Sequence, residues 1–135
     1  MMKHLKTRAV DQSEYVVYWN RAEEFYETMQ HAHKNRMWTS VGLNAVHCVI
    51  SSCDAVLVKS QGIRAAGDDH MQAVELLARS PIAGVEKQAA TVRRIIAKKN
   101  VIAYESREFR ESDASDIFKQ TGRFYSWAFE YLNKK

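Results

Sequence analysis

The chain contains few of the residues that interrupt regular structure. Its 135 residues include one proline and five glycines. Both residue types disrupt helices, so their scarcity favours long, uninterrupted helices. There are only two cysteines, Cys48 and Cys53, and on an expected helix they point in different directions and cannot form a disulfide with each other. Two cysteines buried as small apolar side chains are typical of a reducing compartment, so we expect a cytoplasmic protein.

The signals of membrane insertion and secretion are also missing. No apolar run approaches the roughly 20 residues that are needed to span a bilayer. The first ten residues, MMKHLKTRAV, are basic but have no apolar segment after them, so they do not read as a signal peptide. The glycine-rich phosphate loop of P-loop enzymes and the serine elbow of hydrolases are absent as well. We therefore expect no membrane partner and none of those two chemistries.

Metal ligands do not occur in a recognisable pattern. His31 and His33 are two positions apart, which places them on different faces of a helix, and no cysteine or carboxylate cluster accompanies them. His47, Glu23 and Glu24 do not form the paired Glu-x-x-His motifs of a di-iron bundle. The sequence predicts no metal site and no cofactor.

The charge balance is mild. The formal net charge is +4 and the isoelectric point is near 9.1. This excess permits contact with nucleic acid or nucleotide phosphates but does not require it. Hydrophobic residues make up 46% of the chain and charged residues 27%, which is ordinary for a globular protein. We expect one domain over residues 1–135, with residues 1–10 frayed.

The most informative segment is Asn44–Lys59, which is apolar on all sides except one. At 100° per residue its polar residues share about a quarter of the helix circumference. A helix that is apolar nearly all round is normally buried at the centre of its domain. The polar seam must then be satisfied inside the protein, across a subunit interface or at a ligand site. The seam consists of Asn44, His47, Ser51 and Asp54.

The first two helices can be bounded from their caps. Asp11–Glu14 resembles a capping box, and apolar residues then recur at helical spacing over Tyr15–Lys34. A break near residues 35–38 precedes the central helix, for which Thr39 or Ser40 is the expected N-cap. The central helix is therefore expected to begin within a few residues of the break.

Residues that typically end or cap helices separate the remaining helices. Gly62 is placed to end the central helix, and Asp68 or Asp69 to cap a short third helix. Ser80-Pro81 predicts the start of a fourth helix, and Ser112 is the expected cap of a fifth. The last two helices are expected to bury Val85, Ala89, Val92, Ile95 and Ile96, and then Ile117, Phe118, Thr121, Phe124, Ala128 and Leu132.

No segment shows the alternation of a half-buried strand. The sequence therefore predicts an all-α protein, an up-and-down bundle of four long helices plus one short helix.

Four tracts of the chain resemble the HEPN domains, the nucleotide-binding domains of higher eukaryotes and prokaryotes. The tracts are AVHCVISSCDAVLVKSQG, DDHMQAVELL, KKNVIAYES and DASDIFKQTGRFYSWAFEYL, and together they cover nearly the whole chain. The resemblance implies a single HEPN-like helical domain over residues 1–135. It also implies a homodimer and a cognate antitoxin or nucleotidyltransferase partner.

Catalytic HEPN domains are metal-independent ribonucleases with an Arg-x(4–6)-His motif near the bend before the last helix. At that place this chain has Lys98, Lys99 and Asn100, with Tyr104 in place of the histidine. Tyrosine titrates near 10 and cannot replace histidine as a neutral-pH proton donor, and lysine lacks the two-pronged guanidinium. The resemblance therefore implies nucleotide or RNA binding without catalysis. The lysines would offset phosphate charge, Asn100 would hydrogen-bond a base or sugar, and Tyr104 would stack or donate its hydroxyl.

A metal-independent endoribonuclease of the toxin–antitoxin type is the alternative. A literal Arg-x(5)-His occurs from Arg64 to His70, in the loop after the central helix. His47 or His70 would transfer the proton, Arg64 or Lys99 would stabilise the transition state, and Asp54 would orient His47 or help to bind the nucleotide. The competing interpretation of the polar seam is a buried network that fixes helix register.

Two further features allow either binding or plain structure. The basic segment Arg93–Arg110 could face a phosphate backbone, with Tyr104 and Phe109 stacking on bases, or it could be a solvated helix face. Aromatic residues spread over more than one face of the last helix, which indicates a partner surface, most simply a homodimer. A pure protein-interaction module is thus a third possible function. The aromatic residues are Phe118, Phe124, Tyr125, Trp127, Phe129 and Tyr131.

Overall fold

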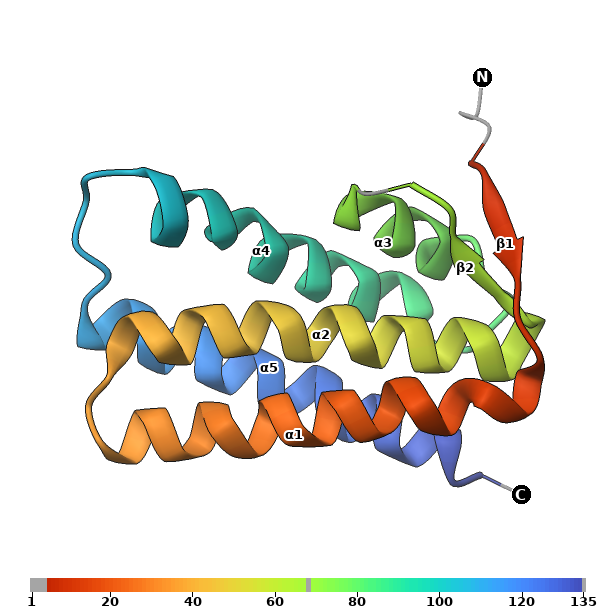
Figure 1. Ribbon diagram of the computed structural model, residues 1–135, viewed down its shortest axis with the longest axis horizontal. Helices are drawn as coiled ribbons and strands as arrows, with labels where there is room; N and C mark the ends of the chain where they lie inside the picture. Colours follow the sequence, from red (N-terminus) through yellow and green to blue (C-terminus); the bar gives the residue numbers. More distant parts are fainter. Residues whose placement is uncertain (1–4, 68, 135) are drawn as a thin grey trace.

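The computed structural model describes residues 5–67 and 69–134. Within them the chain forms five α-helices, one short 3₁₀ turn and a two-stranded sheet (Figure 1). In chain order these are β1 (Thr7–Ala9), the 3₁₀ turn (Gln12–Glu14), α1 (Tyr15–Lys34), α2 (Trp38–Gln61), β2 (Ile63–Ala65), α3 (His70–Ala78), α4 (Val85–Tyr104) and α5 (Glu111–Leu132). The all-α class is confirmed. The four long helices alternate in direction along the longest axis, and α3 is the short one.

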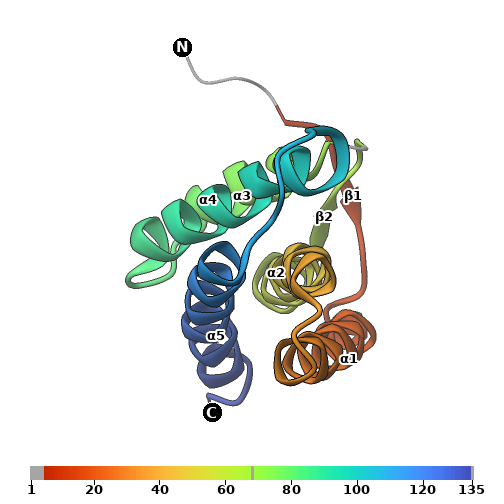
Figure 2. The ribbon, with the colours of Figure 1, turned by 90° about the vertical axis from the view of Figure 1, so that its left-hand side faces the viewer.

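Helix α2 lies at the centre of the molecule. It packs against α1, α3, α4 and α5, and the end-on view in Figure 2 shows it surrounded by the other long helices. Its buried residues are largely small, and Ala45, Cys48 and Ala55 are fully buried, so neighbouring helices can approach it from several sides. The predicted central helix is confirmed.

Helix α2 is also long and apolar enough to cross a membrane by length and composition alone. In the folded protein, 78% of its most apolar window is buried by the surrounding helices. Its hydrophobicity is therefore explained by its place in the core.

Two of the predicted helix boundaries are confirmed. Gly62 ends α2 in the left-handed conformation (φ 64°), and its N–H donates to the carbonyl of Val58. Asp69 caps α3, with its carboxylate accepting a hydrogen bond from the Met71 N–H at 3.0 Å. Asp68, the other candidate cap, lies outside the described residues.

Two of the predicted helix starts were wrong. Helix α2 begins after Met37, so Thr39 and Ser40 lie inside its first turn. Ser80 does not begin a helix: its hydroxyl donates to the Leu76 carbonyl at 3.0 Å and closes α3 instead. Helix α4 begins after Gly84, whose φ of 77° turns the chain.

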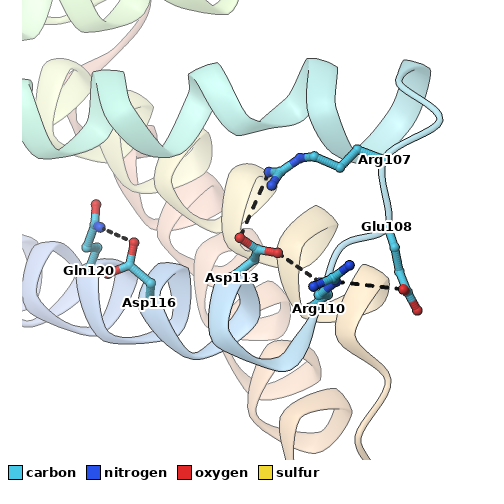
Figure 3. A network of polar contacts seen from close by, with 6 residues as sticks. All are labelled: Arg107, Glu108, Arg110, Asp113, Asp116 and Gln120. Carbon is cyan, nitrogen blue, oxygen red and sulfur yellow. Dashed lines mark hydrogen bonds and ion pairs between the residues drawn. The ribbon is translucent and has the colours of Figure 1, made fainter.

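The start of α5 also differs from the prediction, because Ser112 lies within the helix. The Asp113 carboxylate accepts a hydrogen bond from the Arg110 N–H at 2.9 Å and so satisfies the helix start (Figure 3). The guanidinium of Arg107 lies 3.9 Å from the same carboxylate. The carboxylate of Asp113, one residue after Ser112, therefore satisfies the helix start that the serine was expected to cap.

The N-terminal segment was expected to fray, and this was wrong for its described part. Strand β1 pairs antiparallel with β2, with Thr7 opposite Ala65. Leu5 is buried against Leu57 of α2 and Leu76 of α3. The prediction that the chain has no strands was also wrong. These two short strands carry no alternating pattern in the sequence and form only by pairing with each other in the folded protein.

Aromatic rings fill the space between α1 and α5. Tyr125 stacks on Tyr26 with ring centroids 3.9 Å apart, and on Trp19 at 4.7 Å. Phe129 continues the row at 6.3 Å from Trp19 and is 49% exposed. Much of the aromatic surface predicted for a partner is therefore used in packing these two helices. The core positions expected on α4 and α5 are buried, except that Phe118 is half-buried.

Candidate functional site

Three helices bring predicted site residues together on one side of the molecule. His47 projects from α2, His70 is the first residue of α3, and Lys99 lies in the last two turns of α4. Partial burial lowers the pKa of His47, and the nearby charges of His70 and Lys99 lower it further. The ring of Phe25 from α1 stacks on the His47 imidazole with centroids 5.3 Å apart. His47 is therefore held mostly neutral in a positively charged setting.

A hollow of about 240 Å³ opens where α3 begins beside α4. We call it the α3–α4 hollow. Its polar groups are a carboxylate, an imidazole, an ammonium and an amide. It is lined by Asp69, His70, Met71, Ile96, Ala97, Lys99 and Asn100. The N-terminal end of α3 borders it, and there the Asp69 side chain accepts a hydrogen bond from the Met71 N–H. Three of the residues predicted from the sequence, His70, Lys99 and Asn100, thus share one hollow.

Lys98 lies on the other side of α4. It borders a second hollow, of about 340 Å³, between α4 and α5, which we call the α4–α5 hollow. Its lining is Arg94, Ile95, Ala97, Lys98, Val101, Asp116, Ile117 and Gln120. The amide of Gln120 donates to the Asp116 carboxylate at 2.9 Å (Figure 3). Ala97 borders both hollows, so the exposed crest of α4 separates them.

Tyr104 ends α4 and is 78% exposed. Asn100 lies one turn before it on the same face of the helix, since the two residues are four positions apart. A large aromatic ring with that exposure contributes little to the core. Its face is free to stack on a planar ligand.

Arg64 and Asp54 form a separate cluster. The Arg64 guanidinium lies 3.2 Å from the Asp54 carboxylate, 3.4 Å from the Tyr18 hydroxyl and over the Tyr18 ring. Burial raises the pKa of Asp54, and the charge of Arg64 and its hydrogen bond oppose that rise. The pKa of Arg64 is raised by Asp54 and Tyr18, although burial opposes this. Asp54 is seven residues from His47, which is roughly 10 Å along α2.

The polar seam of α2 is thus divided rather than joined. Asn44 donates its amide to the Ser40 carbonyl at 2.8 Å, one turn back. Ser51 and Asp54 are buried, whereas His47 is exposed. The polar residues of the seam therefore have separate roles. Asn44 bonds within its own helix, Asp54 pairs with Arg64, and His47 lies near His70 and Lys99.

The cations of the basic segment Arg93–Arg110 fall into two groups, those with a carboxylate partner and those without one. Arg93 pairs with Glu75 of α3 at 2.9 Å, and Arg107 and Arg110 each lie 3.9 Å from a neighbouring carboxylate. In the described part of the chain no ion pair involves the other three cations, which are Arg94, Lys98 and Lys99. Phe109, expected to stack on bases, is buried in the core, so this expectation was wrong.

The net positive charge of the protein resides on α4. This helix carries Lys87, Arg93, Arg94, Lys98 and Lys99 against Glu86 alone, a net charge of +4. The formal charge of the whole chain is also +4, so the rest of the sequence is balanced. The composition alone looked only mildly basic because it averages one strongly basic helix with a neutral remainder.

Sequence reasoning did not find two of the residues that shape these sites. Phe25 carries no motif, and its contact with His47 depends on how α1 packs on α2. Asp116 lies one turn of α5 before Gln120 and borders a hollow that forms only when α4 and α5 meet. Among the described residues, no group of three or more histidine, cysteine or carboxylate side chains could hold a metal ion.

Larger hollows lie elsewhere but hold none of the predicted site residues. One of about 430 Å³ lies between residues 81–83 and the end of α5, beside Trp127 and Tyr131. Its charged groups are Glu130 and Lys134, which balance each other. It offers an aromatic wall without a cluster of ionisable groups.

Comparison with protein-family models, curated proteins and solved structures returned no match.

Proposed function

We propose that this protein binds a phosphate-bearing ligand, a nucleotide or RNA, at the α3–α4 hollow. The observation that carries the proposal is that His70, Lys99 and Asn100 of two helices line one hollow. His47 of α2 lies close enough to His70 and Lys99 for their charges to lower its pKa. A cluster of cationic and titratable groups at a helix N-terminus is a typical setting for an anion. The sequence resemblance to HEPN domains supports the same class of ligand and a HEPN-like assignment for the bundle.

Each residue has a distinct role in this proposal. The Lys99 ammonium would offset phosphate charge, and His70 would donate a hydrogen bond from the first turn of α3. Asn100 would bond a base or sugar edge, and Tyr104 would stack on a base. The Asp69 carboxylate caps α3 and also lines the hollow, where it would repel a phosphate. A phosphate would therefore have to approach from the Lys99 side.

Fluorescence anisotropy of a labelled RNA, in EDTA and at fixed salt, tests the proposal. We expect the wild type to bind, and Lys99→Ala to lose about 1.5–3 kcal/mol of binding free energy, the range for a hydrogen bond to a charged group. Arg93→Ala is the matched control, since it removes a cation of the same helix that Glu75 already neutralises. Equal losses in both variants would contradict a site at the α3–α4 hollow.

A metal-independent ribonuclease is the second candidate, and the pairing of two histidines with a lysine favours it. His47, with its lowered pKa, is suited to take a proton from a ribose 2′-hydroxyl near neutral pH. The 2′-oxygen would bond to phosphorus as the bond from phosphorus to the 5′-oxygen breaks, leaving a 2′,3′-cyclic phosphate. His70 would protonate the leaving 5′-oxygen, and Lys99 would stabilise the negative charge on the phosphorus-bound oxygens. Arg64 has no part in this version, because Asp54 and Tyr18 hold its guanidinium.

Incubation of purified protein with a structured RNA in EDTA separates the two candidates. Cleavage with a bell-shaped pH profile that disappears in His47→Ala or His70→Ala would establish the ribonuclease. Intact RNA, with a mobility shift on a native gel, would leave binding as the function.

A further inference from the structure

We infer that the ligand is a single-stranded nucleic acid of several nucleotides whose backbone crosses the crest of α4 from the α3–α4 hollow to the α4–α5 hollow. The inference rests on the proposed function and specifies its substrate class. The observations that carry it are the two hollows, the shared Ala97 between them and the positions of the unpaired cations.

The two hollows flank one helix. Lys99 lies at the α3–α4 hollow, and Arg94 and Lys98 lie at the α4–α5 hollow. At the crest between them stands Ala97, an exposed residue with a one-carbon side chain that leaves the helix low at this point. An α-helix with its side chains is roughly 10–12 Å wide. A single phosphate cannot reach both sides of it, whereas a chain of linked phosphates can.

The ion-pairing pattern favours the same path. Among the described residues, Arg94, Lys98 and Lys99 are the cations of residues 93–104 of α4 without a carboxylate partner, whereas Arg93 is paired with Glu75. The Arg94 guanidinium donates to the Thr91 hydroxyl at 3.2 Å, a neutral partner that leaves its charge uncompensated. Asp116 carries the one carboxylate of the α4–α5 hollow, and the Gln120 amide is bonded to it. Uncompensated positive charge therefore lies on both sides of the Ala97 crest, which suits a strand whose phosphates cross it.

Tyr104 favours a single strand over a duplex. Its ring is 78% exposed and lies one turn beyond Asn100, on the face that the strand would follow. Stacking on an aromatic ring requires a base that is not already stacked in a duplex. Basic groups that track the backbone, together with an aromatic platform, are the pattern of sequence-tolerant single-strand binding.

A length series tests the inference. The probes are 5′-phosphorylated oligouridylates of one, two, four and eight nucleotides, a matched RNA duplex, and a polyglutamate peptide with the charge of the longest strand. We expect affinity to rise at least tenfold between two and four nucleotides and to be lower for the duplex and the peptide. Binding that does not change with length, or a duplex or peptide that binds as well as the strand, would overturn the inference.

Variants on the two sides of α4 provide the second arm. We expect Arg94→Ala with Lys98→Ala to weaken binding of the eight-nucleotide strand at least tenfold and to lower the salt dependence by about 0.7 per lost phosphate contact. The same variant should leave the mononucleotide unaffected. Lys119→Ala with Arg123→Ala removes two exposed cations of α5 that border neither hollow, and is the matched control.

A third arm separates stacking from hydrogen bonding at Tyr104. We expect Tyr104→Phe to retain strand affinity and Tyr104→Ala to lose roughly tenfold, because only the alanine removes the ring on which a base stacks. The outcomes also distinguish the two proposals. If the mononucleotide binds through Lys99 while the length series is flat, the inference fails and the proposed function stands. If no nucleotide or RNA binds at all, both fail.

Discussion

Lys98 and Lys99 are adjacent in the sequence but lie at different hollows. Lys98 borders the α4–α5 hollow and Lys99 the α3–α4 hollow, because consecutive residues of a helix point about 100° apart. The two lysines would therefore contact different parts of a bound ligand. We expect Lys99→Ala to weaken binding of a mononucleotide and of a strand, and Lys98→Ala to weaken binding of the strand alone. Equal effects of the two substitutions on the mononucleotide, measured by titration calorimetry, would show that they serve one site.

Binding should strengthen as the pH falls from about 7.5 to 5.5. The pKa of His47 in the free protein lies below its ordinary 6.5 because of burial, His70 and Lys99. A bound phosphate would counter those positive charges and raise that pKa, so proton uptake would accompany binding. Affinity measured across this range should lose much of its pH dependence in His47→Gln. The second ionisation of a terminal phosphate acts in the opposite direction, because acid removes negative charge from the ligand. A strengthening at low pH that survives in both His47→Gln and His70→Gln would therefore show that neither histidine takes up the proton.

His47 also makes stability dependent on pH. Its lowered pKa means that the unfolded state binds a proton more readily than the folded state does. The free energy of unfolding should therefore rise with pH through the window up to about 6.5, and fall as acid protonates the unfolded chain. Urea unfolding of wild type and His47→Gln at pH 5.5 and 7.5 measures this contribution. The gain in stability between the two values should be smaller in the variant.

Removing Arg64 should destabilise the protein mainly at neutral pH. Arg64→Met leaves the buried Asp54 without its cation, at a cost of about 3 kcal/mol. The pKa of Asp54 is already raised by burial, so its protonated form favours the folded state and this favourable contribution is lost as the pH rises. The cost of the substitution should therefore shrink as the pH falls towards 4. Asp54→Asn in the same background should recover most of it, whereas a loss that is equal at every pH would assign the effect to packing on Tyr18.

Gly62 and Gly84 form a matched pair for backbone strain. Both have φ in the left-handed region, at 64° and 77°, where an alanine costs about 1–2 kcal/mol. A Cβ at Gly62 would also lie 3.0 Å from the Val10 carbonyl oxygen, whereas a Cβ at Gly84 would meet nothing within 4 Å. We expect Gly62→Ala to lower the denaturation midpoint more than Gly84→Ala does. The reverse order would show that the contact between the N-terminal segment and α2 is not fixed.

Both thiols should be unreactive in the folded protein. Burial raises the pKa of Cys48 to about 12 and that of Cys53 well above its usual value, and both side chains are fully buried. Labelling with a chromogenic disulfide at pH 8 should therefore proceed only as fast as the protein opens, and should accelerate with urea. Rapid labelling of one thiol in native buffer would contradict the burial of that side chain.

The helices and their core faces were predictable because each depends on local periodicity. The apolar residues of Asn44–Lys59 surround that segment, and only the centre of a bundle accommodates such a helix. Gly62 and Asp69 were recognisable because each terminates or begins a helix through its own backbone or side chain. The caps predicted at Ser80 and Ser112 were wrong because residue types that often cap helices also occur at other positions. At the start of α5 the Asp113 carboxylate satisfies the helix end instead, and Ser80 bonds to the end of α3.

The candidate site was predictable only as a set of residue types. His70, Lys99 and Asn100 could be named from the sequence, but their sharing a hollow depends on how α3 packs on α4. The sequence also did not reveal the contacts of Arg64, whose guanidinium binds Asp54 and Tyr18 in the folded protein. Strands β1 and β2 pair across more than fifty residues, and neither has a pattern of its own.

The sequence by itself determined the helical class, the central place of α2 and the residues that face the core, because these follow from the 3.6-residue period and from burial of apolar surface. Only the tertiary structure decided which charges remain unpaired. Arg93 and Arg94 are neighbours on α4, yet one meets Glu75 of α3 and the other meets no carboxylate in the described chain. An ion pair forms between groups within about 4 Å, and that separation is set by helix packing rather than by spacing along the chain.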